Sequence, residues 1–211
     1  MILPLPKSDR EKILFSALEK FRTDGFSKTT MDEISSLSGF SKNTLYKYFP
    51  SKEKLAEEVV ETTVEYINAS VKKILSTREN AITKFIKILH FIVNSVLRYN
   101  QNMLFDIKIH LPELWEKIDN LRTEYMYKNI SKIIRQGKKE KLFCDCRNEI
   151  VITVFMGAMR NIVDPEFINR INLSVNEAVD IAFTVIINGI LTPKGKIIYK
   201  KLKKNNNDKI D

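Results

Sequence analysis

Apolar residues recur at helical spacing along most of the chain, and no stretch alternates between apolar and polar residues as a half-buried strand would. Three short helices are predicted within the first fifty residues, with apolar stripes at Ile13–Phe21, Met31–Leu37 and Leu45–Phe49. Further helices are predicted over 52–75, 79–99, 103–110, 112–139, 147–163 and 176–191. We therefore expect an all-α fold.

Capping residues mark where these helices begin. Four hydroxyl residues are each followed three positions later by a glutamate, which is the capping-box pattern: Ser8, Thr30, Ser76 and Ser174. Gly39 ends the second helix, where a left-handed residue is needed, and Ser41 can cap the third helix almost at once. Two short helices joined by such a sharp turn indicate a helix-turn-helix.

The third predicted helix has two different faces. At 100° per residue, Leu45 and Phe49 fall on the side that faces the first helix. The opposite side carries polar residues and no carboxylate of its own: Lys42, Asn43, Tyr46 and Lys47. Ammonium, amide and phenol groups can bond base edges and phosphates in the major groove. This face therefore predicts DNA binding.

The segment TTMDEISSLSGFSKNTLYKYFPSKEKL, residues 29–55, resembles the signature of the tetracycline-repressor (TetR) family, and residues 13–26 also fit its pattern. The resemblance covers roughly residues 9–60. It implies a three-helix helix-turn-helix DNA-binding domain over 1–50, joined by a long helix to a helical ligand-binding and dimerisation domain over 51–193. It also implies a homodimeric repressor that binds a palindromic operator in duplex DNA and is released by a small-molecule effector.

The resemblance further implies roles for single residues. Thr30 and Thr44 would hold phosphates, and Tyr48 and Lys52 would contact phosphate. Bases or the adjoining backbone would be read by Lys42, Asn43 and Tyr46. An ideal helical wheel puts Tyr48 nearer the buried side, so its role requires the helix to loosen after Lys47.

The last two predicted helices are apolar on more than one side, and such helices must be covered on more than one side. We expect one side to pack within the chain and the other against a second copy, as a four-helix bundle. A fully internal helix pair is the alternative. The candidate interface residues are Ile152, Phe155, Met156, Met159, Phe183, Ile186, Ile187 and Ile190.

The effector pocket is expected among the middle helices, although each candidate could equally be plain core. The mixture of side chains suits an apolar or aromatic compound with one or two polar groups. The candidates are Phe85, His90, Phe91, Met103, Phe105, Trp115, Tyr125 and Met126. His90 and His110 are isolated, so we expect no metal site and no cofactor.

The net charge of +9 is concentrated at the two ends of the chain, with +3 in residues 1–55 and +5 in residues 194–211. We expect residues 194–211 to be a disordered, solubilising tail; a membrane-surface role is the alternative. Cys144 and Cys146 are the two cysteines. One intervening residue is unfavourable for a disulfide, and two thiols are too few for a metal site. Without a signal peptide or a membrane span, the expected location is the cytoplasm.

Two other functional classes remain to be compared. A helical enzyme would need a nucleophile–base pair, a metal cluster or a phosphate-binding loop, and the sequence shows none of these. An activator or a less specific DNA-binding protein would have the same N-terminal helices, so the sequence leaves that alternative open.

Overall fold

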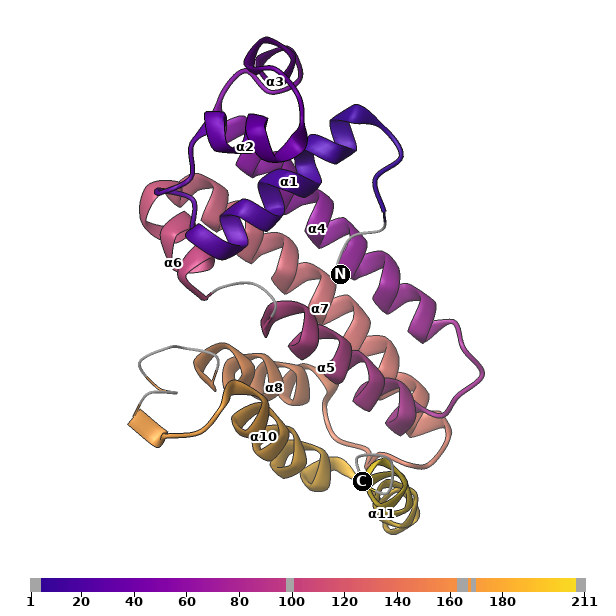
Figure 1. Ribbon diagram of the computed structural model, residues 1–211. Coiled ribbons are helices and arrows are strands. Elements are labelled where there is room, and N and C mark those ends of the chain that lie inside the picture. The colour runs from indigo at the N-terminus through magenta and orange to yellow at the C-terminus, as the bar shows by residue number, and fades with distance from the viewer. Residues whose placement is uncertain (1–4, 98–100, 163–166, 168–169, 208–211) are drawn as a thin grey trace. The chain divides into compact units, whose positions relative to one another are not determined.

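The computed structural model describes residues 5–97, 101–162, 167 and 170–207, with side chains except at 95–97, 101–105 and 205–207. These residues form the helices α1 (Asp9–Asp24), α2 (Met31–Ser38), α3 (Lys42–Tyr48), α4 (Lys52–Leu75), α5 (Ala81–Leu97), α6 (Gln101–His110), α7 (Pro112–Lys139), α8 (Asn148–Ile162), α10 (Val175–Ile190) and α11 (Pro193–Asn207) (Figure 1). Within the described ranges, the β pairing is one isolated bridge between Phe143 and Leu191. The all-α prediction is confirmed.

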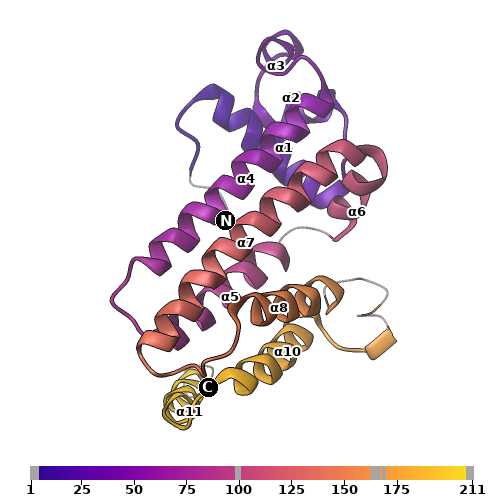
Figure 2. The ribbon, with the colours of Figure 1, turned by 180° about the vertical axis from the view of Figure 1, so that it is seen from behind.

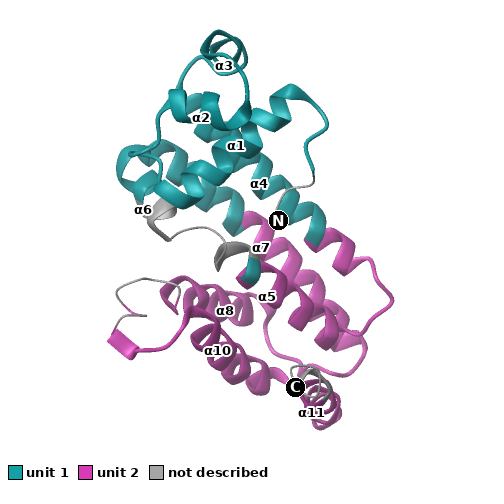
Figure 3. Ribbon diagram, in the orientation of Figure 1, with its two compact units in different colours: residues 1–70, 94–123 teal, residues 71–93, 124–211 magenta. Residues whose placement is uncertain are grey.

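The chain forms two compact units, residues 1–70 with 94–123 and residues 71–93 with 124–211 (Figure 3). The helices α4, α5 and α7 contribute residues to both units. The first unit therefore includes α6 and the start of α7 in addition to the three N-terminal helices. None of the helices within the described residues has a segment long and apolar enough to cross a membrane.

The first unit has a core built around α1. The predicted α1 stripe is buried, with Ile13 and Ala17 fully inaccessible. Leu45 of α3 and Phe49, which follows α3, are also fully buried in this core. Because these side chains are held by neighbouring helices, the short helix α3 takes a fixed orientation.

The second unit has a core in which α8 and α10 pack side by side, as both views show (Figures 1 and 2). Phe85 of α5 lies with its ring centroid 5.2 Å from that of Phe155 and 5.0 Å from that of Phe183. The predicted capping box at Ser174 is present at the start of α10. Aromatic contacts thus join α5, α8 and α10 into one apolar core.

One predicted cap is wrong. Ser76 does not cap α5; its hydroxyl donates to the carbonyl oxygen of Lys73. The helix begins at Ala81, and Asn80 Oδ1 accepts the backbone N–H of Thr83 at 3.0 Å. Asparagine is as good an N-cap as serine, and the sequence pattern did not distinguish the two.

The predicted disorder of residues 194–211 is also wrong for the described part, because residues 193–207 form α11. Thr192 Oγ1 accepts the N–H of Gly195 at 3.1 Å, which caps the helix. Tyr199 is only 5% exposed, and Gly195 is buried against the carbonyl oxygen of Leu142. Because the segment is rich in lysine, its composition did not indicate that one side of it is apolar and buried. Residues 208–211 lie outside the described residues.

Replacement of Gly137 by alanine should destabilise the protein. A Cβ atom at Gly137 would lie 2.1 Å from Cδ2 of Phe143, a buried ring with little space to move. We expect the free energy of unfolding to fall by about 1–3 kcal/mol, as for other overpacked sites, measured by urea denaturation. Arg135→Ala, at an exposed position of the same helix, is the control and should change it by less than about 0.5 kcal/mol. Wild-type stability of Gly137→Ala would contradict this packing.

Candidate DNA-binding site

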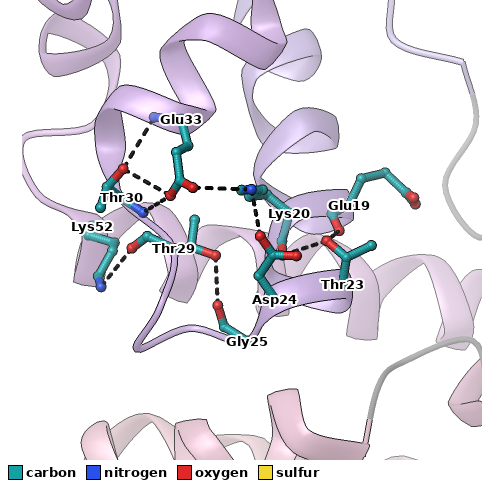
Figure 4. A network of polar contacts seen from close by, with 9 residues as sticks. All are labelled: Glu19, Lys20, Thr23, Asp24, Gly25, Thr29, Thr30, Glu33 and Lys52. Atoms are coloured by element: carbon teal, nitrogen blue, oxygen red, sulfur yellow. Dashed lines mark hydrogen bonds and ion pairs between the residues drawn. The ribbon is translucent and has the colours of Figure 1, made fainter.

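The second helix begins with a complete capping box. Thr30 Oγ1 accepts the N–H of Glu33 at 3.3 Å, and Glu33 Oε2 accepts the N–H of Thr30 at 2.8 Å. Lys20 of α1 lies 3.2 Å from Glu33 Oε1 (Figure 4). The Thr30 amide and hydroxyl, and then Lys20, lower the pKa of Glu33. The ionised Glu33 carboxylate therefore stabilises the folded state above the usual glutamate pKa. This contribution is lost as the pH falls through the lower pKa that Glu33 has in the folded protein.

The turn between α2 and α3 has the predicted geometry. Gly39 has φ 75° and ψ 17°, and its N–H donates to the carbonyl oxygen of Ser35. The N–H of Phe40 donates to the same oxygen at 3.2 Å. Ser41 then caps α3, since its hydroxyl oxygen accepts the N–H of Thr44 at 3.2 Å. The left-handed residue thus lets α3 begin with only three residues between it and the end of α2.

The outward face of α3 is exposed, as predicted. Lys42, Asn43 and Lys47 are exposed, and Tyr46 is 48% exposed. The helix ends at Tyr48, because Phe49 has extended backbone angles. Tyr48 is still part of the helix and is 41% exposed, although an ideal helical wheel puts it nearer the buried side.

Two predicted DNA contacts already have protein partners. Lys42 Nζ lies 2.5 Å from a carboxylate oxygen of Asp32 in α2. The face has no carboxylate of its own, but tertiary packing brings Asp32 of α2 to it. Both side chains are more than half exposed, and such pairs contribute at most about 1 kcal/mol, so phosphate can compete. Thr44 is half-buried, with its hydroxyl 2.9 Å from that of Ser41.

Lys52 points into the loop between α1 and α2. Its Nζ lies 3.0 Å from the carbonyl oxygens of Phe26 and Thr29 and 3.4 Å from that of Ser27. The same ammonium lies 4.3 Å from the Phe26 ring centroid. An ammonium has three donors, and all three have acceptors here. Lys52 therefore holds this loop against the first turn of α4 (Figure 4), and the phosphate contact implied by the resemblance stays a prediction.

Asp106 of α6 binds the same loop. Its Oδ2 accepts the N–H of Ser27 at 2.6 Å, while Thr29 Oγ1 donates to the carbonyl oxygen of Gly25 at 2.7 Å. The loop is thus held by α4 and α6 directly before Thr30. Sequence reasoning missed Asp106, since 79 residues separate it from Ser27 and no local pattern connects them.

The predicted pocket residues fall in both units. Trp115 packs against the core of the first unit. Five others belong to the second unit: Phe85, His90, Phe91, Tyr125 and Met126. Phe85 is 2% exposed, and His90 lies near the surface, 3.8 Å from Asp180. The side chains of Met103 and Phe105 lie outside the described residues.

A groove of about 500 Å³ in the first unit contains none of these candidates. Charged and titratable side chains line much of it: Glu53, Lys54, Glu57, His110, Glu113 and Lys117. This lining does not match the apolar effector expected from the sequence. Among the described residues, no three or more His, Cys, Asp and Glu side chains gather in a group that could hold a metal ion.

The candidate dimer residues divide into two groups. Five are buried within the chain and present no surface to a second copy: Ile152, Phe155, Phe183, Ile187 and Ile190. Met156, Met159 and Ile186 are half-buried. The apolar residues that are exposed on α8 and α10 are Ile150, Val154, Ile181 and Val185. Because both helices are apolar on two sides, the sequence pattern could not tell which side faced inward.

A short polar helix, held outward by a glycine turn and a buried leucine–phenylalanine pair, defines a helix-turn-helix DNA-binding regulator. Residues 13–59 match the family model described as "Bacterial regulatory proteins, tetR family". The chain belongs to the TetR family of transcriptional regulators.

Similar proteins agree with this assignment. The chain is 23% identical over 181 residues to the HTH-type transcriptional regulator YvaF of Bacillus subtilis, covering 85% of this chain and 94% of YvaF. It is 30% identical over 79 residues to the HTH-type transcriptional repressor KstR2 of Mycolicibacterium smegmatis, covering 37% of this chain and 38% of KstR2. A regulator from Saccharomonospora viridis, solved in complex with choline, superposes with a TM-score of 0.69 at 18% identity, covering 87% of this chain and 97% of that one.

Replacement of Lys52 by alanine should destabilise the protein. The three loop carbonyls lose a charged donor, and bonds of this kind contribute about 1.5–3 kcal/mol. We expect a lower thermal midpoint and a fall of that order in the free energy of unfolding, measured by calorimetry and by urea denaturation. Lys54→Ala is the matched control, since exposed Lys54 contacts Glu57 on the same helix and should contribute less than about 1 kcal/mol. Equal stability of the two variants would exclude the loop contact as a stabilising feature.

Proposed function

We propose that this regulator is a ligand-released repressor that binds a palindromic operator as a homodimer and acts in the cytoplasm. The observation that carries the proposal is the exposed polar face of α3, held by the fully buried side chains of Leu45 and Phe49. A helix presented in this way fits the width of the major groove. The likeness to a repressor over 79 residues supports the direction of regulation.

The side chains of this face suit two kinds of contact. Asn43 can pair bidentately with adenine, and Tyr46 and Lys42 can bond a base or the adjoining backbone. Lys47, exposed on the same helix, adds a charge that attracts phosphate without selecting sequence. Thr30, Thr44, Tyr48 and Lys52 remain the proposed phosphate contacts. For Lys52 this contact requires release of at least one loop carbonyl.

The second unit supports dimer formation. Val154 of α8 and Val185 of α10 are 54% and 69% exposed, and each follows another exposed residue, Ile150 or Ile181, by four positions. The two helices thus each carry an apolar stripe that the described part of the chain leaves exposed. Contiguous exposed apolar surface of this kind is typical of an interface. A second copy that packs its own α8 and α10 on these stripes gives a two-fold four-helix bundle.

For a ligand to release the protein from DNA, its binding must affect the DNA-binding helices. The contact of α6 with the loop before α2 offers a route for this effect. Asp106 binds the loop that leads to Thr30 and α2, so movement of α6 would change the support of the helix-turn-helix. A ligand that favours such a state lowers DNA affinity by linkage. The half-buried residues Phe91, Tyr125 and Met126 remain candidates for the effector pocket, whereas Phe85 serves the core of the second unit.

Selection of bound fragments from random duplex DNA tests the proposal. The purified protein should enrich a palindrome with half-sites about one or two helical turns apart. Asn43→Ala should lose the preference at one base pair in each half-site, costing about 1–3 kcal/mol there, measured by fluorescence anisotropy. Glu65→Ala, at an exposed position of α4, is the control and should select the wild-type site. Enrichment without two-fold symmetry, or uniform weakening by Asn43→Ala, would contradict the proposal.

Replacement of Val185 by glutamate should convert the dimer to monomer. A carboxylate would enter the proposed interface without a partner, which is costly. Sedimentation should then give the monomer mass while circular dichroism keeps its helical signal. Ile197→Glu is the matched control, because Ile197 is 59% exposed on α11 of the same unit, and it should remain dimeric. A wild-type protein that is monomeric, or a Val185→Glu variant that stays dimeric, would exclude this interface.

A further inference from the structure

The two thiols of the chain meet in the segment between α7 and α8. Sγ of Cys144 lies 3.5 Å from Sγ of Cys146, and the Cys146 thiol lies 3.6 Å from the carbonyl oxygen of Cys144. Both side chains are half-buried, and the sequence contains no other cysteine. Within one chain, each thiol can therefore form a disulfide only with the other.

The backbone explains why the two sulfurs are so close. The N–H of Cys146 donates to the carbonyl oxygen of Cys144 at 3.0 Å, which is a three-residue γ-turn centred on Asp145. An extended chain separates residues i and i+2 too far for easy closure, and one intervening residue was expected from the sequence to be unfavourable for a disulfide. The turn shortens that span toward the about 4.4–6.8 Å that disulfide-bonded Cα atoms require.

Neighbouring groups hold this turn in place. Lys138 Nζ lies 3.1 Å from Asp145 Oδ1 and also bonds the carbonyl oxygen of Cys146. On the other side, the N–H of Cys144 donates to the carbonyl oxygen of Ile190 at 2.8 Å. The last turn of α7 and the end of α10 thus both fix the segment that carries the thiols.

We propose that Cys144 and Cys146 are a redox-modification site that forms a reversible intrachain disulfide with a low-molecular-weight disulfide as oxidant. One protein thiolate attacks a sulfur of the oxidant and releases one small thiolate. The other protein thiolate then attacks the mixed disulfide and releases the second. Two protein thiols and one small disulfide become one protein disulfide and two small thiols, so atoms and electrons balance.

The surroundings favour this chemistry over metal binding. A thiophilic metal site with three or four protein ligands would need further donors, and within the described residues no group of three or more His, Cys, Asp and Glu side chains could hold a metal ion. Burial, and then the neighbouring Cys144, raise the pKa of the Cys146 thiol, while Lys138 acts in the opposite direction. Since the thiolate is the reactive form, closure should speed up as the pH rises.

The location gives the modification a structural consequence. The α8 helix begins at Asn148, two residues after Cys146, and the bridge between Phe143 and Leu191 lies directly before Cys144. A disulfide that encloses a single residue restricts the unfolded chain very little, so it adds little stability. The disulfide is therefore suited to a reversible change at the start of α8 and the end of α10, rather than to permanent stabilisation.

Thiol trapping in glutathione buffers tests the proposal. The reduced full-length protein, in EDTA, is incubated at stepped ratios of reduced to oxidised glutathione, quenched with N-ethylmaleimide and analysed by intact mass. We expect one transition from two alkylated thiols to none. The oxidised protein should weigh two hydrogen atoms less than the reduced, unalkylated protein, and no covalent dimer should form. Cys144→Ser and Cys146→Ser should each give only a mixed disulfide with glutathione.

Two neighbouring lysines separate a positioned turn from two thiols that are merely close in sequence. Lys138→Gln removes the contacts with Asp145 and Cys146 and should slow closure several-fold. Lys139→Gln, at an exposed position next to it, should close at the wild-type rate. Stable double glutathione adducts, intermolecular disulfides, or equal closure rates for the two lysine variants would each overturn the proposal. No DNA enters the assay, so its outcome is independent of the proposed repressor function.

Discussion

The burial of Leu45 and Phe49 is the interaction on which the DNA-binding surface depends. The α3 helix has seven residues, too few to be stable alone in water, where helices shorter than about 12–15 residues are marginal. Its conformation therefore comes from the caps at Ser41 and Phe49 and from the core of α1 and α4. Because two side chains on one face are fully enclosed, the opposite face has to point outward.

The loop before α2 connects the DNA-binding helices to α4 and α6 of the first unit. Its carbonyl groups accept from Lys52, and the N–H of Ser27 donates to Asp106. These are bonds to charged groups, which are stronger than neutral ones. A segment of five residues is therefore sensitive to both α4 and α6, and it ends at the N-cap of α2. Such an arrangement allows a displacement of α6 to alter the DNA-binding helices without contact with DNA.

The second unit uses its apolar surface in two ways. On the inner sides of the two helices, Phe155 of α8 and Phe183 of α10 pack against Phe85 of α5. Their outer sides expose valine and isoleucine. Exposure of such stripes is unfavourable unless another surface covers them. The γ-turn with the two thiols lies at the start of α8 and bonds the end of α10, so a covalent change there would act on the same pair of helices.

Local sequence patterns predicted the helices and their order, except for α11. The predicted ranges of α4 and α7 coincide with the observed ones, and the caps at Thr30, Ser41 and Ser174 are present. These features follow from contacts between residues three or four positions apart, which periodicity records directly. The outward face of α3 followed in the same way, since a single apolar stripe on a helix has only one inward side.

The remaining features depend on residues far apart in the chain, so they could be seen only once the helices were packed together. The tertiary structure brought Asp32 to Lys42, Lys52 to the loop carbonyls and Asp106 to Ser27. It also chose the inner side of α8 and α10, which a pattern apolar on two sides leaves undetermined, and folded α11 onto Leu142 through Gly195 and Tyr199. Local spacing carries no information about such partners, since the energy of each contact exists only once the helices have packed.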